Sequence, residues 1–185
     1  SESGMKDYRS EDGLYNTVKQ YKASPETILS HTFFCQHPDV FYDFYYNYFL
    51  DTSAEPNHAH IALAELEKMG KLMAIVTQNI DGLHQRAGSK NVIELHGTIL
   101  RHHCPNCKAF MDYEKVKSFK GKVPRCEKCN HIIKPDVVLY EEPLNEQVTL
   151  SAIDAISSAD MLIIGGTSLA VYPAVGFLRY FRGDN

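Results

Sequence analysis

Two groups of residues in the middle of the chain have types and spacing that could do chemistry. The first combines two amides, a carboxylate and a nearby imidazole: Gln78, Asn79, Asp81 and His96. The second consists of four cysteines in two Cys-x-x-Cys pairs: Cys104, Cys107, Cys126 and Cys129. The first group could hold a ligand that carries an amide, and the second could bind a metal ion.

The two Cys-x-x-Cys pairs offer the tetrahedral sulfur environment that structural zinc prefers. Four protein ligands leave no open position for water, so the expected metal would hold residues 101–134 together and do no chemistry. A pair of disulfides or a redox Cys-x-x-Cys remains the alternative, but no secretory signal is visible to favour it. The nearby His102, His103 and His131 are expected to be exposed, and Cys35, beside two phenylalanines, to be buried.

The polar residues have simpler interpretations as well. Asp81 could merely cap a helix that begins at Gly82, and a lone histidine is more often structural than catalytic. The combination favours chemistry, because Asp accepts from an NH2 group and Asn both donates and accepts. An ordinary histidine pKa of about 6.5 suits His96 to act as a general base near neutrality.

The elements that position these residues alternate between helix and strand. Apolar spacing predicts helices over 56–69 and 146–158, and short apolar runs predict buried strands over 72–76, 137–140 and 161–164. This alternation is typical of an α/β, Rossmann-like doubly wound parallel sheet, in which ligands bind beyond the carboxyl ends of the strands. Residues 12–48, rich in Tyr and Phe, predict a small helical lobe. We therefore expect a Rossmann-like core over 1–100 and 135–185 and a zinc-binding module over 101–134.

Composition narrows the possible partners. The chain has 185 residues, 44% of them hydrophobic, and a net charge of −4, so no overall positive field attracts nucleic acid. No apolar run approaches the roughly 20 residues that cross a bilayer. Four lysines form only a loose group, interpreted as a solvated face: Lys115, Lys117, Lys120 and Lys122. We expect a reducing, cytoplasmic setting with neither nucleic acid nor membrane as partner.

Taken together, the motifs resemble those of the sirtuins, the NAD-dependent protein lysine deacylases. The resemblance runs through essentially the whole chain. It rests on Ser3-Gly4-Met5-Lys6-Asp7-Tyr8-Arg9, Thr77-Gln78-Asn79-Ile80-Asp81, Leu95-His96-Gly97, the two Cys-x-x-Cys pairs, and Gly166-Thr167-Ser168-Leu169 with Val171 and Pro173.

The resemblance implies a particular reaction, with NAD as co-substrate and one structural zinc ion per chain. The acyl-lysine carbonyl oxygen attacks C1′ of the nicotinamide ribose as nicotinamide leaves, and His96 activates a ribose hydroxyl that attacks the imidate. The products are free lysine, nicotinamide and O-acyl-ADP-ribose. Departure of a neutral amine from a ribosyl cation resembles glycoside cleavage.

The resemblance also implies roles for individual residues. His96 and Asn79 would be catalytic, and the NAD contacts would come from Asp7, Tyr8, Arg9, Gln78, Asn79, Ile80, Asp81, His96, Gly166, Thr167 and Ser168. Val138, Leu139 and Tyr140 would bind the acyl-lysine substrate, whose backbone pairs as an added strand.

Three departures from the family pattern matter. Tyr140-Glu141-Glu142 stands where sirtuins commonly have Phe-Gly-Glu, and Tyr8 replaces the usual Phe. Residues 45–48 read Tyr-Tyr-Asn-Tyr, without the arginine that sirtuins selective for acidic acyl groups use, so we expect neutral acyl groups, acetyl first.

Two family segments do not occur in these 185 residues: a strand with a Gly-Ala-Gly loop, which would precede Ser1, and a later strand that bears an Asn. That glycine loop places backbone N–H groups against the pyrophosphate. We therefore expect residues 1–185 alone to bind NAD poorly, and micromolar binding in a calorimetric titration would contradict this.

The sequence alone leaves three possible functions open. The first is an NAD-dependent protein lysine deacetylase. A sirtuin-like ADP-ribosyltransferase shares every cofactor residue, and a zinc-containing acyl-lysine or ADP-ribose binding module needs no base. The base candidate His96 favours an enzyme.

Overall fold

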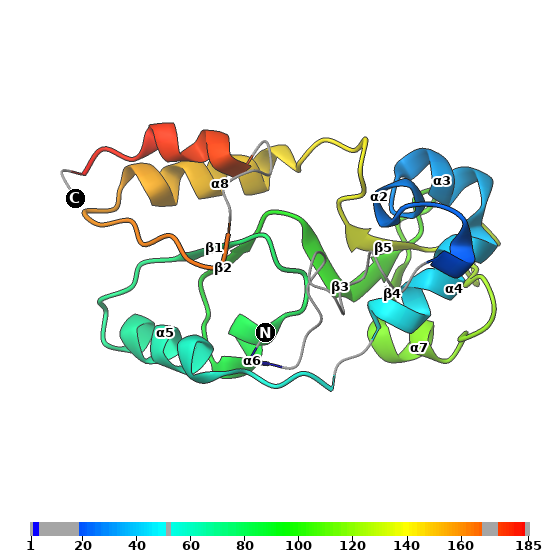
Figure 1. Cartoon of the computed structure of the whole chain (residues 1–185), viewed down its shortest axis with the longest axis horizontal. Coiled ribbons are helices and arrows are strands. Elements are labelled where there is room, and N and C mark those ends of the chain that lie inside the picture. Colours follow the sequence, from blue (N-terminus) through cyan, green and yellow to red (C-terminus); the bar gives the residue numbers. More distant parts are fainter. Residues whose placement is uncertain (1, 4–18, 51–52, 168–173, 184–185) are drawn as a thin grey trace.

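Figure 1 shows the computed structural model of the chain, which describes residues 2–3, 19–50, 53–167 and 174–183. The helices are η1 (Lys19–Tyr21), α2 (Pro25–Ile28), α3 (His31–Gln36), α4 (Pro38–Tyr48), α5 (His58–Lys68), α6 (Leu83–Ala87), α7 (Tyr113–Lys117), α8 (Glu146–Ser157) and η2 (Ala174–Tyr180). The strands are β1 (Ile75–Thr77), β2 (Val92–Glu94), β3 (Gly97–His103), β4 (Phe110–Asp112) and β5 (Lys134–Val137).

The strands form two sheets. β1 and β2 are parallel, with Thr77 opposite Glu94 at their carboxyl ends. β3 is the centre of an antiparallel sheet between β4 and β5. α8 lies on one side of the parallel pair and α5 with α6 on the other (Figure 1). Helices on both sides of parallel strands are the α/β arrangement that the sequence predicts.

The helical lobe and the cysteine-containing segment share one core. The buried residues of this aromatic core come from α2 to α4, from β3 and β4, from α7 and from the segments next to the cysteines: Ile28, Phe34, Phe41, Tyr42, Phe44, Tyr45, Tyr46, Ile99, Met111, Val116, Ile133 and Leu139, among others. These elements gather on the right of Figure 1. Residues far apart in the sequence are thus stabilised by burying apolar surface together.

Tyrosine hydroxyls from α4 connect the lobe to the cysteine segment. Tyr42 donates to the Ile133 carbonyl, and Tyr46 donates to the Lys122 carbonyl at 3.1 Å. The Tyr45 hydroxyl lies 3.0 Å from His102 Nε2. A buried tyrosine hydroxyl needs such a partner. Each tyrosine therefore buries the apolar area of its ring and also fixes the orientation of α4 through its hydrogen bond.

His102 is therefore not exposed, and that sequence prediction is wrong. Its exposed fraction is 0%, because it lies on the face of β3 that α4 covers. Burial lowers its pKa to about 4, so the imidazole is neutral near pH 7. His103 is half-buried and His131 is exposed. The buried environment of Cys35 was also predicted wrongly, since this thiol lies on the outer side of α3 and is exposed.

The second core lies beside the parallel pair. Ala152 and Ile156 of α8 pack with Leu95 and Phe177, and Val76 and Ile93 of the two strands lie against them. α8 confirms the predicted helix, with Asn145 accepting from Val148 N as its N-cap. α5 also confirms its prediction but begins after Pro56, because the Asn57 side chain caps it.

The predicted strand over 161–164 is absent: these residues have no regular structure. Met161 is 63% exposed and Ile163 79%. A strand needs a neighbour for its N–H and C=O groups, and no described residue pairs with this run. The same applies in part to 72–76, where only Ile75–Thr77 is extended and Met73 is 49% exposed. The third predicted strand, 137–140, is displaced: β5 ends at Val137.

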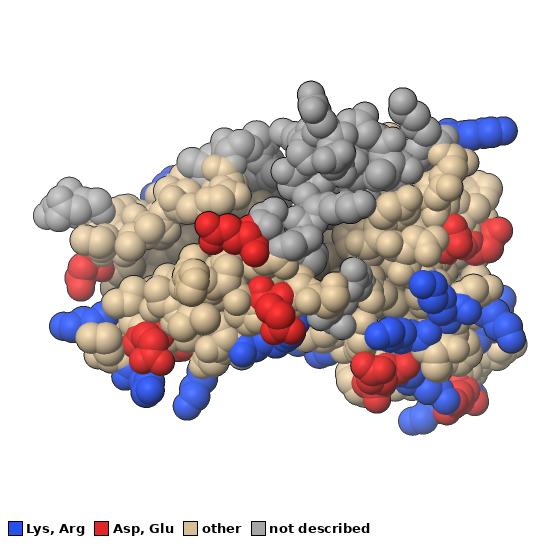
Figure 2. Space-filling model, turned by 60° about the horizontal axis from the view of Figure 1, so that its bottom comes forward, with Lys and Arg blue, Asp and Glu red and all other residues tan. Residues whose placement is uncertain are grey.

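The surface has mixed charge. On the face drawn in Figure 2, Lys and Arg are interspersed with Asp and Glu. The four lysines of the loose group are exposed, which confirms their interpretation as a solvated face. None of the helices among the described residues is long and apolar enough to cross a membrane.

The Tyr45–His102 bond yields a stability prediction. Tyr45→Phe should lower the free energy of unfolding by about 1–3 kcal/mol, because it leaves a buried imidazole nitrogen without its partner. Urea unfolding followed by circular dichroism measures this. Tyr48→Phe on the same helix is the matched control, since Tyr48 is only half-buried and its hydroxyl accepts from Gln20 Nε2 at 3.5 Å at an exposed site, where water can take its place. An equal loss in both variants would contradict the assignment.

Candidate active site and metal centre

His96 lies directly after β2, at the edge where both parallel strands end. Leu95 N donates to the Thr77 carbonyl at 2.9 Å, which continues the pairing one residue past the strand. His96 Nδ1 then lies 3.0 Å from the carbonyl oxygen of Gln78. The imidazole and the polar run are therefore neighbours, as parallel strands with a common edge require.

The hydrogen bond to Gln78 determines the tautomer of His96. A carbonyl oxygen can only accept, so Nδ1 carries the proton and Nε2 keeps its lone pair in the neutral ring. Burial lowers the pKa of His96 below its ordinary value of 6.5, and the Gln78 carbonyl opposes this shift only in part. The ring is thus neutral near pH 7, with Nε2 able to take up a proton.

The polar run continues away from the strand with mixed exposure. Asn79 is exposed, and its backbone N–H donates to Thr77 Oγ1 at 3.0 Å. The Ile80 carbonyl accepts from Ile99 N at 3.0 Å, and the Ile80 side chain packs against the aromatic core. These contacts hold the loop between the two cores and leave the Asn79 amide facing solvent.

Asp81 is not the N-cap that its simpler interpretation predicts, because Gly82 occupies that position before α6. Asp81 Oδ1 nevertheless accepts from N of Leu83, the first residue of α6, at 2.9 Å. Gly82 has a φ of 71°, which lies in the left-handed region. One carboxylate oxygen is used in this way, and a carboxylate has two. The bond orients Asp81 without excluding a ligand.

Gly97 brings His96 against the neighbouring sheet. Its φ is 76°, and a Cβ at this position would lie 2.0 Å from the Asp136 carbonyl oxygen. Any side chain would therefore push β5 away from β3. The close approach lets Val138 N donate to the His96 carbonyl at 3.0 Å. The candidate base and the predicted substrate segment are thus joined by their backbones.

The three predicted substrate residues have different environments. Val138 is half-buried, Leu139 is 3% exposed within the aromatic core, and Tyr140 is 52% exposed. Tyr140 pairs with the segment before α3: its N–H donates to Leu29 O and its carbonyl accepts from His31 N, each at 3.0 Å. Leu139 therefore anchors the segment, and the side chains of its neighbours are the accessible ones.

Two carboxylates beside this segment were not predicted as site residues. Glu142 Oε2 accepts from Leu139 N at 2.8 Å and lies 3.0 Å from Lys134 Nζ, while its Oε1 lies 2.8 Å from His31 Nδ1. Glu141 Oε2 accepts from Thr32 N at 2.9 Å. The partners are distant in sequence, so only the changed motif Tyr-Glu-Glu hinted that this turn is unusual.

Other predicted cofactor residues are only partly described. Gly166 and Thr167 are exposed on the segment after α8, and Gly166 has a φ of 67°. Asp7, Tyr8, Arg9 and Ser168 lie outside the described residues. The described site therefore consists of Gln78 to Asp81, His96 and Val138 to Tyr140.

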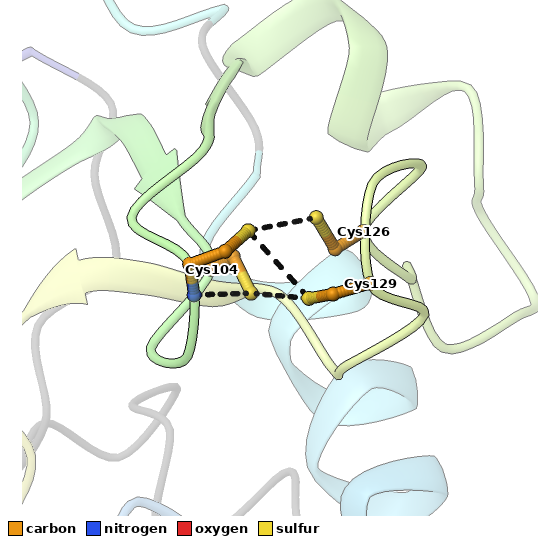
Figure 3. A group of neighbouring side chains, drawn as sticks. Cys104, Cys126 and Cys129 are labelled. Atoms are coloured by element: carbon orange, nitrogen blue, oxygen red, sulfur yellow. Dashed lines mark hydrogen bonds between the residues drawn. The ribbon is translucent and has the colours of Figure 1, made fainter.

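The four cysteines converge as predicted. Their sulfur atoms lie within 4.8 Å of one another, and Figure 3 shows Cys104, Cys126 and Cys129 pointing toward one another. Cys104 Sγ lies 3.4 Å from Cys129 Sγ, and Cys107 Sγ lies 3.5 Å from Cys126 Sγ. Disulfide sulfurs are about 2.05 Å apart, whereas zinc–sulfur bonds of about 2.3 Å in a tetrahedron place sulfurs about 3.8 Å apart. The geometry fits a zinc ion.

Both cysteine pairs use the same backbone turn. The residue after each second cysteine, Lys108 and Asn130, has a φ near 60° (59° and 58°). Its N–H donates to the carbonyl of the first cysteine, at 2.9 Å for Lys108 and 2.8 Å for Asn130. This turn directs both thiols of a pair to one point. The donor set is complete, so the ion that it fits is structural.

Comparisons of the sequence with known proteins match one family. A sequence model described as the Sir2 family matches residues 1–173. An NAD-dependent protein deacetylase of Clostridium perfringens is 58% identical over 186 residues, covering 100% of this chain and 76% of the relative.

Solved structures give the same result. A Sir2 structure with a deacetylated p53 peptide and 3′-O-acetyl ADP ribose matches with a TM-score of 0.86 at 38% identity, covering 97% of this chain and 72% of that one. A complex of a Sir2 homologue with NAD matches with a TM-score of 0.86 at 36% identity, covering 97% and 68%. By these matches the chain falls in a class of NAD-dependent enzymes. This chain belongs to the Sir2 family, the sirtuins.

The metal centre gives a prediction with an internal control. Purified protein should contain about one zinc ion per chain, and Cys104→Ser should lose it, because three thiolates bind more weakly than four. When the metal is removed by a chelator, residues 101–134 should lose their structure earlier than the parallel strands β1 and β2 do. Elemental analysis and hydrogen exchange measure these effects. Cys35→Ser, which removes an exposed thiol outside the cluster, should keep its zinc; loss there would contradict the ligand set.

Proposed function

We propose that this chain is an NAD-dependent protein lysine deacetylase that transfers the acetyl group from acetyl-lysine to ADP-ribose and releases nicotinamide. One observation carries the proposal. His96 is held in the tautomer of a base by Gln78, and the same residue is bonded through its carbonyl to Val138. Base, cofactor loop and substrate segment therefore meet at one residue.

Each group has a defined task in this reaction. Asn79, Ile80 and Asp81 hold the nicotinamide carboxamide, and Gln78 positions the ribose. Nε2 of His96 takes the proton of a ribose hydroxyl as that oxygen attacks the imidate carbon. Tyr8 covers the face that nicotinamide vacates, Arg9 joins Gln78 in positioning the ribose and the phosphates, and Thr167 and Ser168 contact the adenosine half. The exposed amide of Asn79 supports its part, because an amide ligand needs both a donor and an acceptor.

The substrate is an acylated lysine in an extended peptide, with Val138 and Tyr140 lining its path. We propose a preference for neutral acyl groups, acetyl first. The aromatic lobe supports this preference: Tyr45 and Tyr46 are buried and hydrogen-bonded within the core, and residues 45–48 contain no arginine. A carboxylated acyl chain would then find no cation from this part of α4.

The observations support the deacetylase better than either alternative function. A reader of acyl-lysine or ADP-ribose has no use for an imidazole that is half-buried, neutral and bonded into a single tautomer. An ADP-ribosyltransferase would use the same cofactor contacts but would not need Val138 tied to the base. The product distinguishes the two enzymes, because only deacetylation yields O-acetyl-ADP-ribose.

The wider context completes the proposal. We propose a core over 1–100 and 135–185 that includes the helical lobe of 12–48, a zinc-binding module over 101–134, and a cytoplasmic location. Support for the module comes from the four converging thiols. Support for the location comes from the arrangement of these thiols, which suits a metal ion better than disulfides and therefore a reducing compartment.

The assigned base predicts the effect of its removal. In the natural full-length protein, His96→Ala should lower the rate of O-acetyl-ADP-ribose formation by about 100-fold to 10,000-fold, the usual contribution of general base catalysis. Mass spectrometry of the products from NAD and an acetyl-lysine peptide measures this. His58→Ala, an exposed histidine on α5, is the control and should keep full activity.

The pH profile tests the same base in the unmodified enzyme. The active form is deprotonated, so kcat/KM should rise with pH through the pKa of His96. Because burial lowers that pKa, the midpoint of the rise should fall below 6.5. Turnover near the wild-type rate in His96→Ala, or a midpoint above 6.5, would show that another group is the base.

A further inference from the structure

Glu141 adopts a backbone conformation that a glutamate rarely adopts. Its φ is 76°, in the left-handed region that favours glycine. It occupies the middle of the Tyr140-Glu141-Glu142 turn, next to the segment proposed to bind the substrate peptide. A side chain at such a position persists only where its surroundings hold it.

The surroundings of Glu141 consist of the start of α3. Its Oε2 accepts from Thr32 N at 2.9 Å, and contacts with the side chains of Thr32 and Ser30 help to lower its pKa, the Thr32 side chain most of all. The neighbouring residue Glu142 reaches His31 Nδ1 at 2.8 Å. Two consecutive carboxylates thus fasten the turn to one end of one helix.

The hydrogen bonds of the turn determine which backbone groups a peptide could use. The Tyr140 N–H donates to Leu29 O, and the Tyr140 carbonyl accepts from His31 N. The Leu139 N–H donates to Glu142 Oε2, and the Leu139 carbonyl accepts from the Glu142 N–H at 3.1 Å. Val138 N is bonded to His96. Among the described residues, no hydrogen bond uses the backbone N–H or carbonyl of Glu141.

We propose that Glu141 is a positioning residue for the substrate peptide. Its carboxylate anchors the turn to α3 and so maintains the left-handed backbone that presents its own N–H and C=O to the main chain of the peptide. An added strand takes its affinity from such main-chain bonds, so the anchor acts on peptide binding and not on NAD. This inference rests on the proposed deacetylase function.

Two substitutions separate the anchor from the backbone conformation. Glu141→Gly accepts the left-handed φ without strain but removes the carboxylate, and Glu141→Gln keeps an oxygen that can accept from Thr32 N–H. Lys22→Gly is the matched control, because this exposed residue also has a positive φ, 52°, but lies outside both the site and the cysteine module. All three are made in the natural full-length protein.

The expected result is a selective loss of peptide binding. Glu141→Gly should raise the KM and the Kd of a fluorescent acetyl-lysine peptide about five-fold, as expected for losing one hydrogen bond of ordinary net strength. kcat and the KM for NAD should stay within about two-fold, and Glu141→Gln and Lys22→Gly should resemble the wild type. Hydrogen exchange at the Thr32 amide should be faster in Glu141→Gly only.

Each contrary outcome has a distinct meaning. An unchanged peptide KM in Glu141→Gly would overturn the positioning role while the deacetylase function stands. Equal changes in kcat and in both KM values would also overturn it, because they indicate a general defect in folding. A wild-type protein that neither binds nor deacetylates the peptide would refute the function itself, whereas unchanged exchange at Thr32 would refute the anchor.

Discussion

The structure depends on the close approach of two backbones at Gly97. On one side of this residue the chain ends a parallel strand, and on the other it begins the central strand of an antiparallel sheet. The added-Cβ distance of 2.0 Å to the Asp136 carbonyl leaves room for hydrogen alone. Because the junction is this tight, the imidazole that precedes it is held between the parallel pair and the segment that follows β5. A geometric requirement of the fold thus becomes the geometry of the site.

The part of the molecule around the cysteines is held by several weak contributions acting together. Residues 101–134 contribute buried side chains such as Met111, Val116 and Ile133, and α4 contributes buried aromatic ones. Tyrosine hydroxyls then connect the helix to backbone carbonyls and to His102. The four thiols converge at the edge of this shared core, with Cys104 and Cys126 buried in it and Cys107 and Cys129 exposed. A metal at that point would join the exposed cysteines to the buried ones, so metal binding holds parts of the segment that aromatic packing does not cover.

The sequence predicted those features whose partners are near in the chain or whose chemistry is specific. α5 and α8 follow from apolar spacing and capping residues, and the thiol cluster follows from ligand type and pairing. The run over 161–164 shows the limit, because an apolar sequence favours a strand only where another strand accepts its hydrogen bonds. His102 shows a second limit: its burial depends on α4, more than fifty positions away, and an imidazole alone does not reveal that neighbour.

At the site, the sequence identified the residue types but not the interactions that give them their states. A histidine before a glycine has no defined tautomer until the Gln78 carbonyl faces its Nδ1. A glutamate in place of a glycine appears only as a departure from a motif until its φ and its bond to Thr32 are known together. In both cases a backbone group of a distant segment selects one state of a side chain. Because backbone groups are the same at every residue, their positions come from the fold, and the chemistry of this site follows from that placement.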